Sequence, residues 1–297
     1  MPERQKITIT YLNEKKRKKE PITMMAVYDF PAAVLADLVG VEILCVSDTG
    51  AAILFGHPTN NEVSMEEELI MCQAVYRGSE YGLRMADMPY MSYHISADQA
   101  IRNAARLVTE GGMEVMKCEG WKEVAPNIAA IVKAGIPVQG HVGITPMRLV
   151  ALGGVYQTQG RTAESAKRVV EDARLLADIG CFSILCEGVA EEVSQYLAMT
   201  LPVPVISLAA GNKADGVHII QCDLYGGTML KGGKRFKPTH SKMYVDLYGE
   251  EQKAFRLYTD DVIHRRYPGS EHTWKMKGGE LQKFCDLMKW DGFESAA

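Results

Sequence analysis

Ionisable residues recur where short apolar segments of this chain end. Any one of them is explained most simply as a helix N-cap or as one partner of a salt bridge. Six of them, on the ends of five consecutive segments, are harder to explain in this way, because a buried charge must be paired or must bind a metal. These residues are Asp48, Asp87, Lys117, Glu119, His141 and Glu187.

Two aspartates on adjacent segments predict a site for a hard divalent cation. Asp48 and Asp87 offer the oxygen ligands that Mg²⁺ prefers, with waters and substrate oxygens in the other positions. No Cys or His cluster has zinc-site spacing. A cation chelated by the carboxylate and keto oxygens of a 2-oxo acid would stabilise the enolate formed when a C3 proton leaves. A nearby carboxylate, its pKa raised by burial, would act as the base. Lys117 would offset negative charge near the substrate carboxylate.

Three other polar residues have weaker signals. His141 lies in the segment Gly140–Pro146. A lone histidine is more often structural than catalytic, but flanking glycines would let a ligand approach the backbone closely, so both interpretations stay open. Asp29 and Asp223, at the first and last apolar segments, are interpreted as helix caps or salt-bridge partners.

The elements that would position these residues alternate regularly between strands and helices. Short, almost wholly apolar runs are typical of parallel strands covered on both faces, and amphipathic stretches between them predict helices. The predicted strands are Ile22–Asp29, Glu42–Asp48, Leu83–Pro89, Glu114–Gly120, Pro137–Ile144, Ser183–Val189, Pro204–Ala210 and Val217–Tyr225. The clearest helices are Met65–Arg77, Ala97–Glu110, Trp121–Lys133, Ala163–Ile179 and Glu191–Leu201.

Eight such units predict an α/β protein with a closed (β/α)8 TIM barrel, whose active site lies at the carboxyl ends of the strands. No glycine-rich dinucleotide fingerprint follows the first strand, which disfavours an open nucleotide-binding sheet. We expect one domain over residues 1–297, with the barrel at about residues 20–230. From about residue 240 we expect additional helices, including Gln252–His264, and a polar tail after Trp274.

The composition is that of an ordinary globular protein, with 47% hydrophobic and 24% charged residues. A net charge of −4 gives no electrostatic case for nucleic acid binding. The basic run Lys15–Lys19 is interpreted as a solvated helix face rather than a phosphate-binding or targeting patch. No apolar stretch is long enough for a membrane span. The charged first twenty residues and the unpatterned cysteines predict a reduced, cytoplasmic protein.

The chain resembles the ketopantoate hydroxymethyltransferase family (3-methyl-2-oxobutanoate hydroxymethyltransferase), within the phosphoenolpyruvate mutase/isocitrate lyase superfamily of barrels. The resemblance runs almost collinearly from about Ile7 to Trp274. Together, in order, its motifs are specific. They are Ile22–Asp29, Ala86–Tyr93, Gly140–Pro146 and Tyr267–His272.

The resemblance implies a role for each matching residue. Asp48 and Asp87 match the magnesium-binding aspartates, where metal and substrate meet, and Glu119 matches the acidic residue beside the metal. Glu187 matches the proposed general base. The other matches concern the substrate: Thr49 replaces a serine that binds its carboxylate, Lys117 matches the substrate-binding lysine, and Tyr28 and His141 match residues that line the pocket.

The implied reaction transfers a hydroxymethyl group from 5,10-methylenetetrahydrofolate to 3-methyl-2-oxobutanoate, giving 2-dehydropantoate for pantothenate synthesis. The implied assembly is a homo-oligomer, typically a decamer in this family.

Some rim residues depart from the family pattern. Trp121 and Met147 replace a glycine and a glutamine, and the segments Ser47–Ala51 and Ser207–Gly211 are altered. Two alternatives therefore stay open. One is a related aldolase or lyase with another 2-oxo acid or with free formaldehyde as donor. The other is a non-catalytic homologue.

Overall fold

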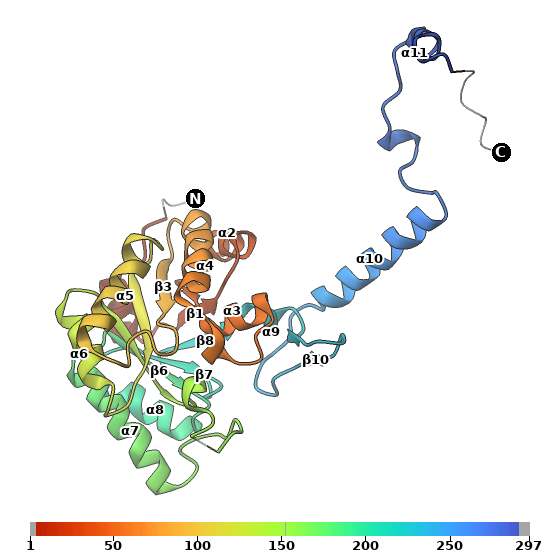
Figure 1. Ribbon diagram of the computed structural model, residues 1–297. Helices are drawn as coiled ribbons and strands as arrows, with labels where there is room; N and C mark the ends of the chain where they lie inside the picture. Colours follow the sequence, from red (N-terminus) through yellow and green to blue (C-terminus); the bar gives the residue numbers. More distant parts are fainter. Residues whose placement is uncertain (1–3, 152, 291–297) are drawn as a thin grey trace. The chain divides into compact units, whose positions relative to one another are not determined.

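Eight parallel strands close into a barrel in order along the chain, as predicted (Figure 1). The structure, a computed structural model, describes residues 4–151 and 153–290. The strands lie within the predicted segments, except that the last begins one residue earlier. They are β1 Ile22–Ala26, β2 Ile43–Val46, β3 Leu83–Asp87, β4 Val115–Glu119, β5 Val138–Gly143, β6 Ser183–Glu187, β7 Val205–Leu208 and β8 Gly216–Ile220.

Helices connect the first seven strands and cover the outside of the barrel (Figure 1). The five predicted helices are confirmed, the third of them four residues shorter at its start; α2 and α3 were not predicted. The helices are α2 Phe30–Val39, α3 Asp48–Phe55, α4 Met65–Gly78, α5 Ala97–Thr109, α6 Ala125–Lys133, α7 Ala163–Asp178 and α8 Glu191–Thr200. The side chain of Asp29 accepts a hydrogen bond from the amide of Ala32 at 2.8 Å, so it caps α2 as expected.

The barrel lacks helices on one side. No helix is found between β7 and β8, and β8 leads directly into the four-residue α9, Gln221–Leu224, too short to cover it. The prediction of a strand as far as Tyr225 is therefore wrong at its end. Asp223 lies on α9, where it accepts a hydrogen bond from Ser241 Oγ at 2.7 Å. The outward side chain of Val217 on β8 is 48% exposed as a result.

Helix α1, Ile9–Lys18, packs at the amino-terminal end of the barrel. Its Leu12 is fully buried in a core cluster with barrel residues that include Ile22, Ile43 and Leu83. Lys15 forms an ion pair with Glu42, and Lys16 Nζ lies 2.6 Å from Asp215 Oδ2. The prediction of a solvated face is thus wrong for these two lysines, whose charges join the helix to the loops before β2 and β8.

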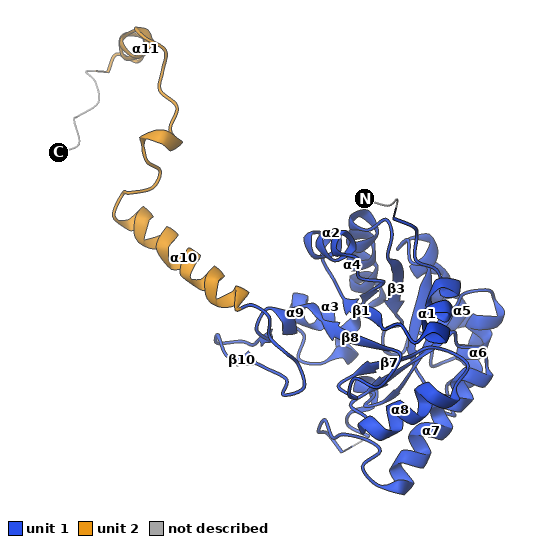
Figure 2. Ribbon diagram, turned by 180° about the vertical axis from the view of Figure 1, so that it is seen from behind, with its two compact units in different colours: residues 1–245 blue, residues 246–297 orange. Residues whose placement is uncertain are grey.

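The chain divides into two compact units, Met1–Val245 and Asp246–Ala297 (Figure 2). The first unit contains the barrel and a two-stranded ribbon of β9, Thr228–Met229, and β10, Arg235–Phe236. The second contains α10, Leu247–Ile263, in the region expected to be helical, and α11, Glu280–Met288, which was predicted to be a polar tail. Residues 291–297 of that tail lie outside the described residues. The single-domain interpretation stays a prediction.

None of the helices in the described part of the chain combines the length and apolar character needed to cross a membrane.

Candidate active site

The deepest charged pair of the site joins β3 to β4. Asp87 Oδ2 lies 2.8 Å from Lys117 Nζ, and both side chains are buried. The strand register places the two residues directly opposite each other. The pKa of Lys117 is raised: burial, the largest single cause, would lower it, but the neighbouring groups, led by Asp87, together outweigh the burial. Lys117 is therefore charged and neutralises Asp87.

Asp48 lies beside this pair, as the first residue of α3 rather than the last residue of a strand. Ser47 caps the helix by accepting a hydrogen bond from the amide of Gly50 at 3.1 Å. The amide of Asp48 donates to Asp87 Oδ2 at 3.4 Å. Burial, followed by repulsion from Asp87, raises the pKa of Asp48 to about 7. Two buried carboxylates thus lie side by side with Lys117 as their counter-charge.

Thr49 and Tyr28 complete this side of the site. The amide of Thr49 donates to Asp48 Oδ1 at 2.7 Å. Asn60, which the sequence interpretation missed, donates from Nδ2 to Asp48 Oδ1 at 3.1 Å and to Thr49 Oγ1 at 2.8 Å. The buried ring of Tyr28 lies against Gly50, where a Cβ would be 2.5 Å from Tyr28 Cδ1. Because Tyr28 packs there, position 50 of the altered segment 47–51 leaves no room for a side chain.

Glu119, at the end of β4, has a backbone partner. The amide of Met147 lies 3.3 and 3.2 Å from the two oxygens of its carboxylate. Burial, followed by repulsion from Asp48, raises the pKa of Glu119 well above its usual range. Its carboxylate is thus within the electrostatic reach of Asp48, and Met147 fixes its orientation.

His141 and Glu187 meet at the ends of β5 and β6. His141 Nε2 lies 3.2 Å from Glu187 Oε2, although the ring is not aligned for a hydrogen bond. The neighbouring glycines have packing roles. A Cβ on Gly140 would be 2.8 Å from Leu176 Cδ1, and one on Gly143 would be 2.3 Å from the carbonyl oxygen of Glu187. Packing therefore suffices to explain these glycines, and the approach of a ligand to them stays a prediction. Gly143 allows β6 to bring Glu187 close to His141.

Two buried residues near the site were not predicted. His218 on β8 shares one layer of the barrel interior with Lys117, as the strand registers require. Burial, followed by the charge of Lys117, lowers the pKa of His218 to about 3. Glu68 on α4 is fully buried, and its oxygens have no hydrogen-bond partner among the described residues. Its position on the apolar face of α4, with Met71, Cys72 and Val75, could have indicated burial.

A third residue that was not predicted, Tyr156, lies on the loop between β5 and α7. Burial and then the charges of Glu187, Asp48 and Glu119 raise the pKa of its phenol. Its phenol is therefore within the electrostatic reach of these carboxylates, although the residue is 60% exposed.

The donor set fits a magnesium ion in part. The adjacent oxygens of Asp48 and Asp87 are hard ligands whose mutual repulsion a divalent cation would relieve. Within residues 4–151 and 153–290, no three His, Cys, Asp or Glu side chains form a ready-made metal cluster. Mg²⁺ usually binds through one or two carboxylates and keeps several waters, so two aspartates suffice. Glu119, already bonded to Met147, fits a contact through water better than a direct bond.

A family model described as ketopantoate hydroxymethyltransferase matches residues 6–270. The chain belongs to this family. It is 39% identical to the 3-methyl-2-oxobutanoate hydroxymethyltransferase of Oleidesulfovibrio alaskensis, over 89% of each chain. It is 36% identical to the enzyme of Arabidopsis thaliana named 3-methyl-2-oxobutanoate hydroxymethyltransferase 1, mitochondrial, over 99% of this chain and 85% of that one. The resemblance inferred from the motifs is thereby confirmed, and the chain is a transferase of this family.

Solved structures support the fold. Phosphonopyruvate hydrolase in complex with oxalate and Mg²⁺ superposes with a TM-score of 0.55 at 15% identity, covering 94% of this chain and 98% of the other. The 2,3-dimethylmalate lyase of the PEP mutase/isocitrate lyase superfamily gives a TM-score of 0.55, also at 15% identity, covering 95% and 94%. The predicted TIM barrel is therefore confirmed.

Proposed function

We propose that this protein transfers a hydroxymethyl group from 5,10-methylenetetrahydrofolate to 3-methyl-2-oxobutanoate, forming 2-dehydropantoate, with Mg²⁺ or another divalent ion. The observation that carries the proposal is the arrangement of Asp48, Asp87 and Lys117 at one side of the rim, with Glu187 and His141 on the strands beyond. Cation ligands, a countercharge and a base are then present on one rim. Family membership supports the choice of substrate.

Each side chain has a proposed task in binding or proton transfer. Asp48 and Asp87 would hold the cation, which supplies stabilisation of the negative charge that develops on the keto oxygen. The ammonium of Lys117 offsets charge near the substrate carboxylate, and Thr49 Oγ1, oriented by Asn60, binds that carboxylate. Tyr28 supports α3 through Gly50.

The proton at C3 of the substrate is taken by Glu187. The C3–H bond breaks, its proton moves to a Glu187 oxygen, and the electron pair forms the bond from C3 to the one-carbon unit. The two bonds from that carbon to folate nitrogens break, and water supplies the hydroxyl group. The nitrogens take up one proton from water and one from Glu187, so tetrahydrofolate leaves and the base is restored. The Glu187 side chain is 20% exposed and lies beside the His141 ring. Its carboxylate is therefore accessible to a substrate bound at the rim.

The second candidate keeps the same proton abstraction with another 2-oxo acid or with formaldehyde as donor. The observation that favours it is the altered rim, where Trp121 and Met147 replace smaller or more polar residues. A non-catalytic role is disfavoured because every matched acidic residue and Lys117 is retained.

Proton NMR of 3-methyl-2-oxobutanoate, Mg²⁺ and purified protein, with and without 5,10-methylenetetrahydrofolate, tests the proposal. We expect 2-dehydropantoate to form only with the folate. Product from formaldehyde alone at an equal rate would support the second candidate. No product from either donor would contradict the proposal.

We also propose a homo-oligomer, with a decamer as the family's typical assembly. The support lies in α10, which has no buried residue and exposes Phe255, Tyr258 and Ile263 at 68%, 60% and 70%. Apolar surface of this kind usually marks an interface. Analytical ultracentrifugation tests this, and a monomer at micromolar concentration would contradict it. A cytoplasmic location stays a prediction.

A further inference from the structure

Trp121 lies at the centre of an aromatic cluster on the flank of the rim. It is the second residue after Glu119, on the loop between β4 and α6. The guanidinium carbon of Arg148 lies 4.2 Å from the centroid of the Trp121 ring system, and the His94 ring centroid lies 5.8 Å away. The loops after β3, β4 and β5 thus each contribute one of these side chains.

The cluster is held rigidly from the β3 side. His94 packs between Tyr90 and Tyr93, with ring centroids 5.4 and 4.1 Å away. Three side-chain amides bind successive carbonyls of this loop: Gln99 to Met91, Asn103 to Ser92 and Asn127 to Tyr93, at 3.0, 2.7 and 2.9 Å. Met91 has a φ of 62°, a strained value for a residue with a side chain.

The structure of this loop has a stability cost. Both ring nitrogens of His94 are buried without a partner among the described residues. The loop is thus kept in a costly conformation, which is more typical of a binding surface than of a region selected for stability alone.

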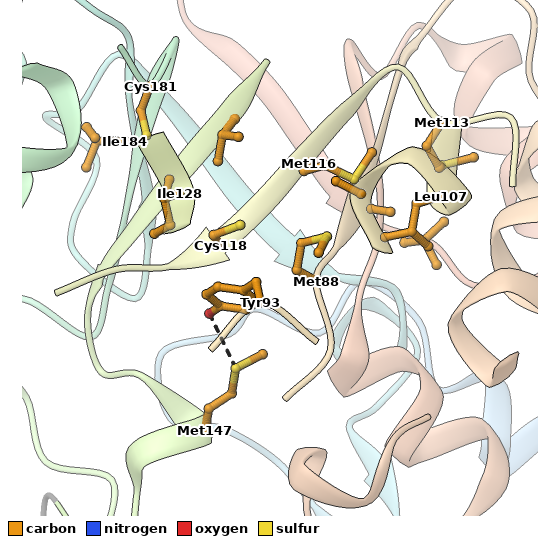
Figure 3. Packing of buried hydrophobic residues seen from close by; sticks show 14 of the residues in the cluster. Met88, Tyr93, Leu107, Met113, Met116, Cys118, Ile128, Met147, Cys181 and Ile184 are labelled. Carbon is orange, nitrogen blue, oxygen red and sulfur yellow. Dashed lines mark hydrogen bonds between the residues drawn. The ribbon is translucent and has the colours of Figure 1, made fainter. Parts of the chain in front are cut away.

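The cluster is connected directly to Glu119. The hydroxyl of Tyr93 is within hydrogen-bond distance of the Glu119 carbonyl, at 2.9 Å, and of Met147 Sδ, at 3.6 Å (Figure 3). The amide of Met147 in turn binds the Glu119 carboxylate. Arg148 follows Met147 directly in the chain. Adjacent residues thus contact the Glu119 carboxylate and the Trp121 ring.

The guanidinium of Arg148 has no hydrogen bond or ion pair with any residue that the structure describes. Asp172 on α7 is near enough for Arg148 to counter part of the rise in pKa that burial causes there, but no ion pair joins them. Glu123 and Glu171 are the carboxylates that act on Asp172. An arginine stacked on tryptophan keeps its donors in a fixed plane and is suited to bind a carboxylate ligand.

We propose that Trp121 and Arg148 bind the distal part of the one-carbon donor, a planar aromatic ring that ends in carboxylates. The ring would stack on the Trp121–Arg148 pair, and the carboxylates would bind the guanidinium. This inference rests on the proposed function, and it selects a folate rather than formaldehyde, which has neither ring nor charge. Trp121, which departs from the family pattern, then becomes a specificity residue for the donor.

The test compares donors and variants in the full-length protein. Arg148→Met removes the charge, Trp121→Gly removes the ring, and Trp121→Phe retains an aromatic face. The matched control is Arg174→Met, because Arg174 lies 5.7 Å from the Tyr196 ring in a similar pair on the outer helices. KM is measured for 5,10-methylenetetrahydrofolate. Binding is measured by isothermal titration calorimetry with tetrahydrofolate and with tetrahydropteroate, which lacks the glutamate.

We expect Arg148→Met to raise KM for the folate about tenfold, as for the loss of one charge-assisted contact. The same variant should erase any preference for tetrahydrofolate over tetrahydropteroate. Trp121→Gly should weaken both ligands, while Trp121→Phe and Arg174→Met stay near the wild type. C3 proton exchange of the 2-oxo acid needs no donor, so it verifies that the rest of the site is intact.

An unchanged folate KM in both Arg148→Met and Trp121→Gly, with 2-dehydropantoate still formed, would overturn this inference and leave the proposed function standing. Wild-type exchange without folate-dependent product would overturn both the donor assignment and this inference. Absence of exchange in the wild type would refute the proposed function at its first step.

Discussion

Asp87 Oδ2 and Lys117 Nζ lie 2.8 Å apart in the barrel interior, with side chains only 2% and 9% exposed. The pair is more than an accessory to the cation site. It determines which substitutions the barrel can tolerate, because removing either partner leaves the other buried charge without its nearest counter-charge.

Asp87→Asn should therefore lower stability as well as abolish metal-dependent turnover. We expect the free energy of unfolding to fall by about 3–5 kcal/mol, measured by urea denaturation. Asp98→Asn is the matched control, since Asp98 and Arg102 are also 2.8 Å apart but about three-quarters exposed. It should leave the free energy of unfolding almost unchanged, because solvent screens an exposed ion pair. Equal effects of the two substitutions would show that burial of the Asp87 pair is not what matters.

Glu187→Gln should slow C3 proton exchange by about 10²-fold or more, because the amide cannot accept the proton. Binding of the 2-oxo acid should change far less, since Glu187 is not expected to hold the substrate. Exchange is followed by NMR in D₂O and binding by calorimetry. The control is Glu191→Gln, on the neighbouring helix and paired with Lys213 instead. Unchanged exchange in Glu187→Gln would assign the base to another group.

His218 should make the protein less stable in acid. Its pKa is lowered from 6.5 to about 3 by burial and by Lys117, so the unfolded chain takes up a proton between these values while the folded protein does not. Stability due to the neutral imidazole is complete above pH 6.5 and is lost as the pH falls toward 3. The loss amounts to at most about 1.4 kcal/mol per pH unit.

The leucine variant His218→Leu isolates this effect. Acidic residues with raised pKa values, such as Glu119, act in the opposite direction and are common to both proteins. Urea denaturation at several pH values should show the variant gaining stability relative to the wild type as the pH falls from 6.5. A constant difference across that range would mean that His218 is protonated in the folded protein.

Helix α10 should carry an oligomer contact. Phe255, Tyr258 and Val262 recur at helical spacing and are all exposed. Replacing Phe255 and Tyr258 by glutamate should lower the mass found by light scattering, while Lys253→Gln, on the opposite side of the same helix, should not. Unchanged mass in the double variant would exclude this face as the contact.

The strands could be predicted because their apolar runs reflect burial on both faces, and the rim residues because each follows such a run. Asp48, Lys117 and Glu187 were found in this way. The end of the eighth strand was misjudged because the apolar residues Cys222 and Leu224 continue the strand's alternation into α9. The short connection between β7 and β8 has no helix, and the sequence pattern did not show how this would expose the outer face of β8.

Other features depend on contacts distant in sequence. Asn60 matters only because it reaches Asp48 and Thr49. Lys15 and Lys16 look like a solvated run until Glu42 and Asp215 are placed beside them. The glycines around His141 suggested space for a ligand, and packing against Leu176 and the Glu187 backbone suffices to explain them.

The most direct test of the proposed chemistry is the C3 proton of 3-methyl-2-oxobutanoate, followed by NMR in D₂O with Mg²⁺ and then with excess chelator. We predict loss of the C3 proton signal with Mg²⁺, little loss with chelator, and loss slowed about 10²-fold in Glu187→Gln. Exchange at the same rate with chelator would contradict a role for the cation. No exchange at all with Mg²⁺ present would contradict proton abstraction from this substrate.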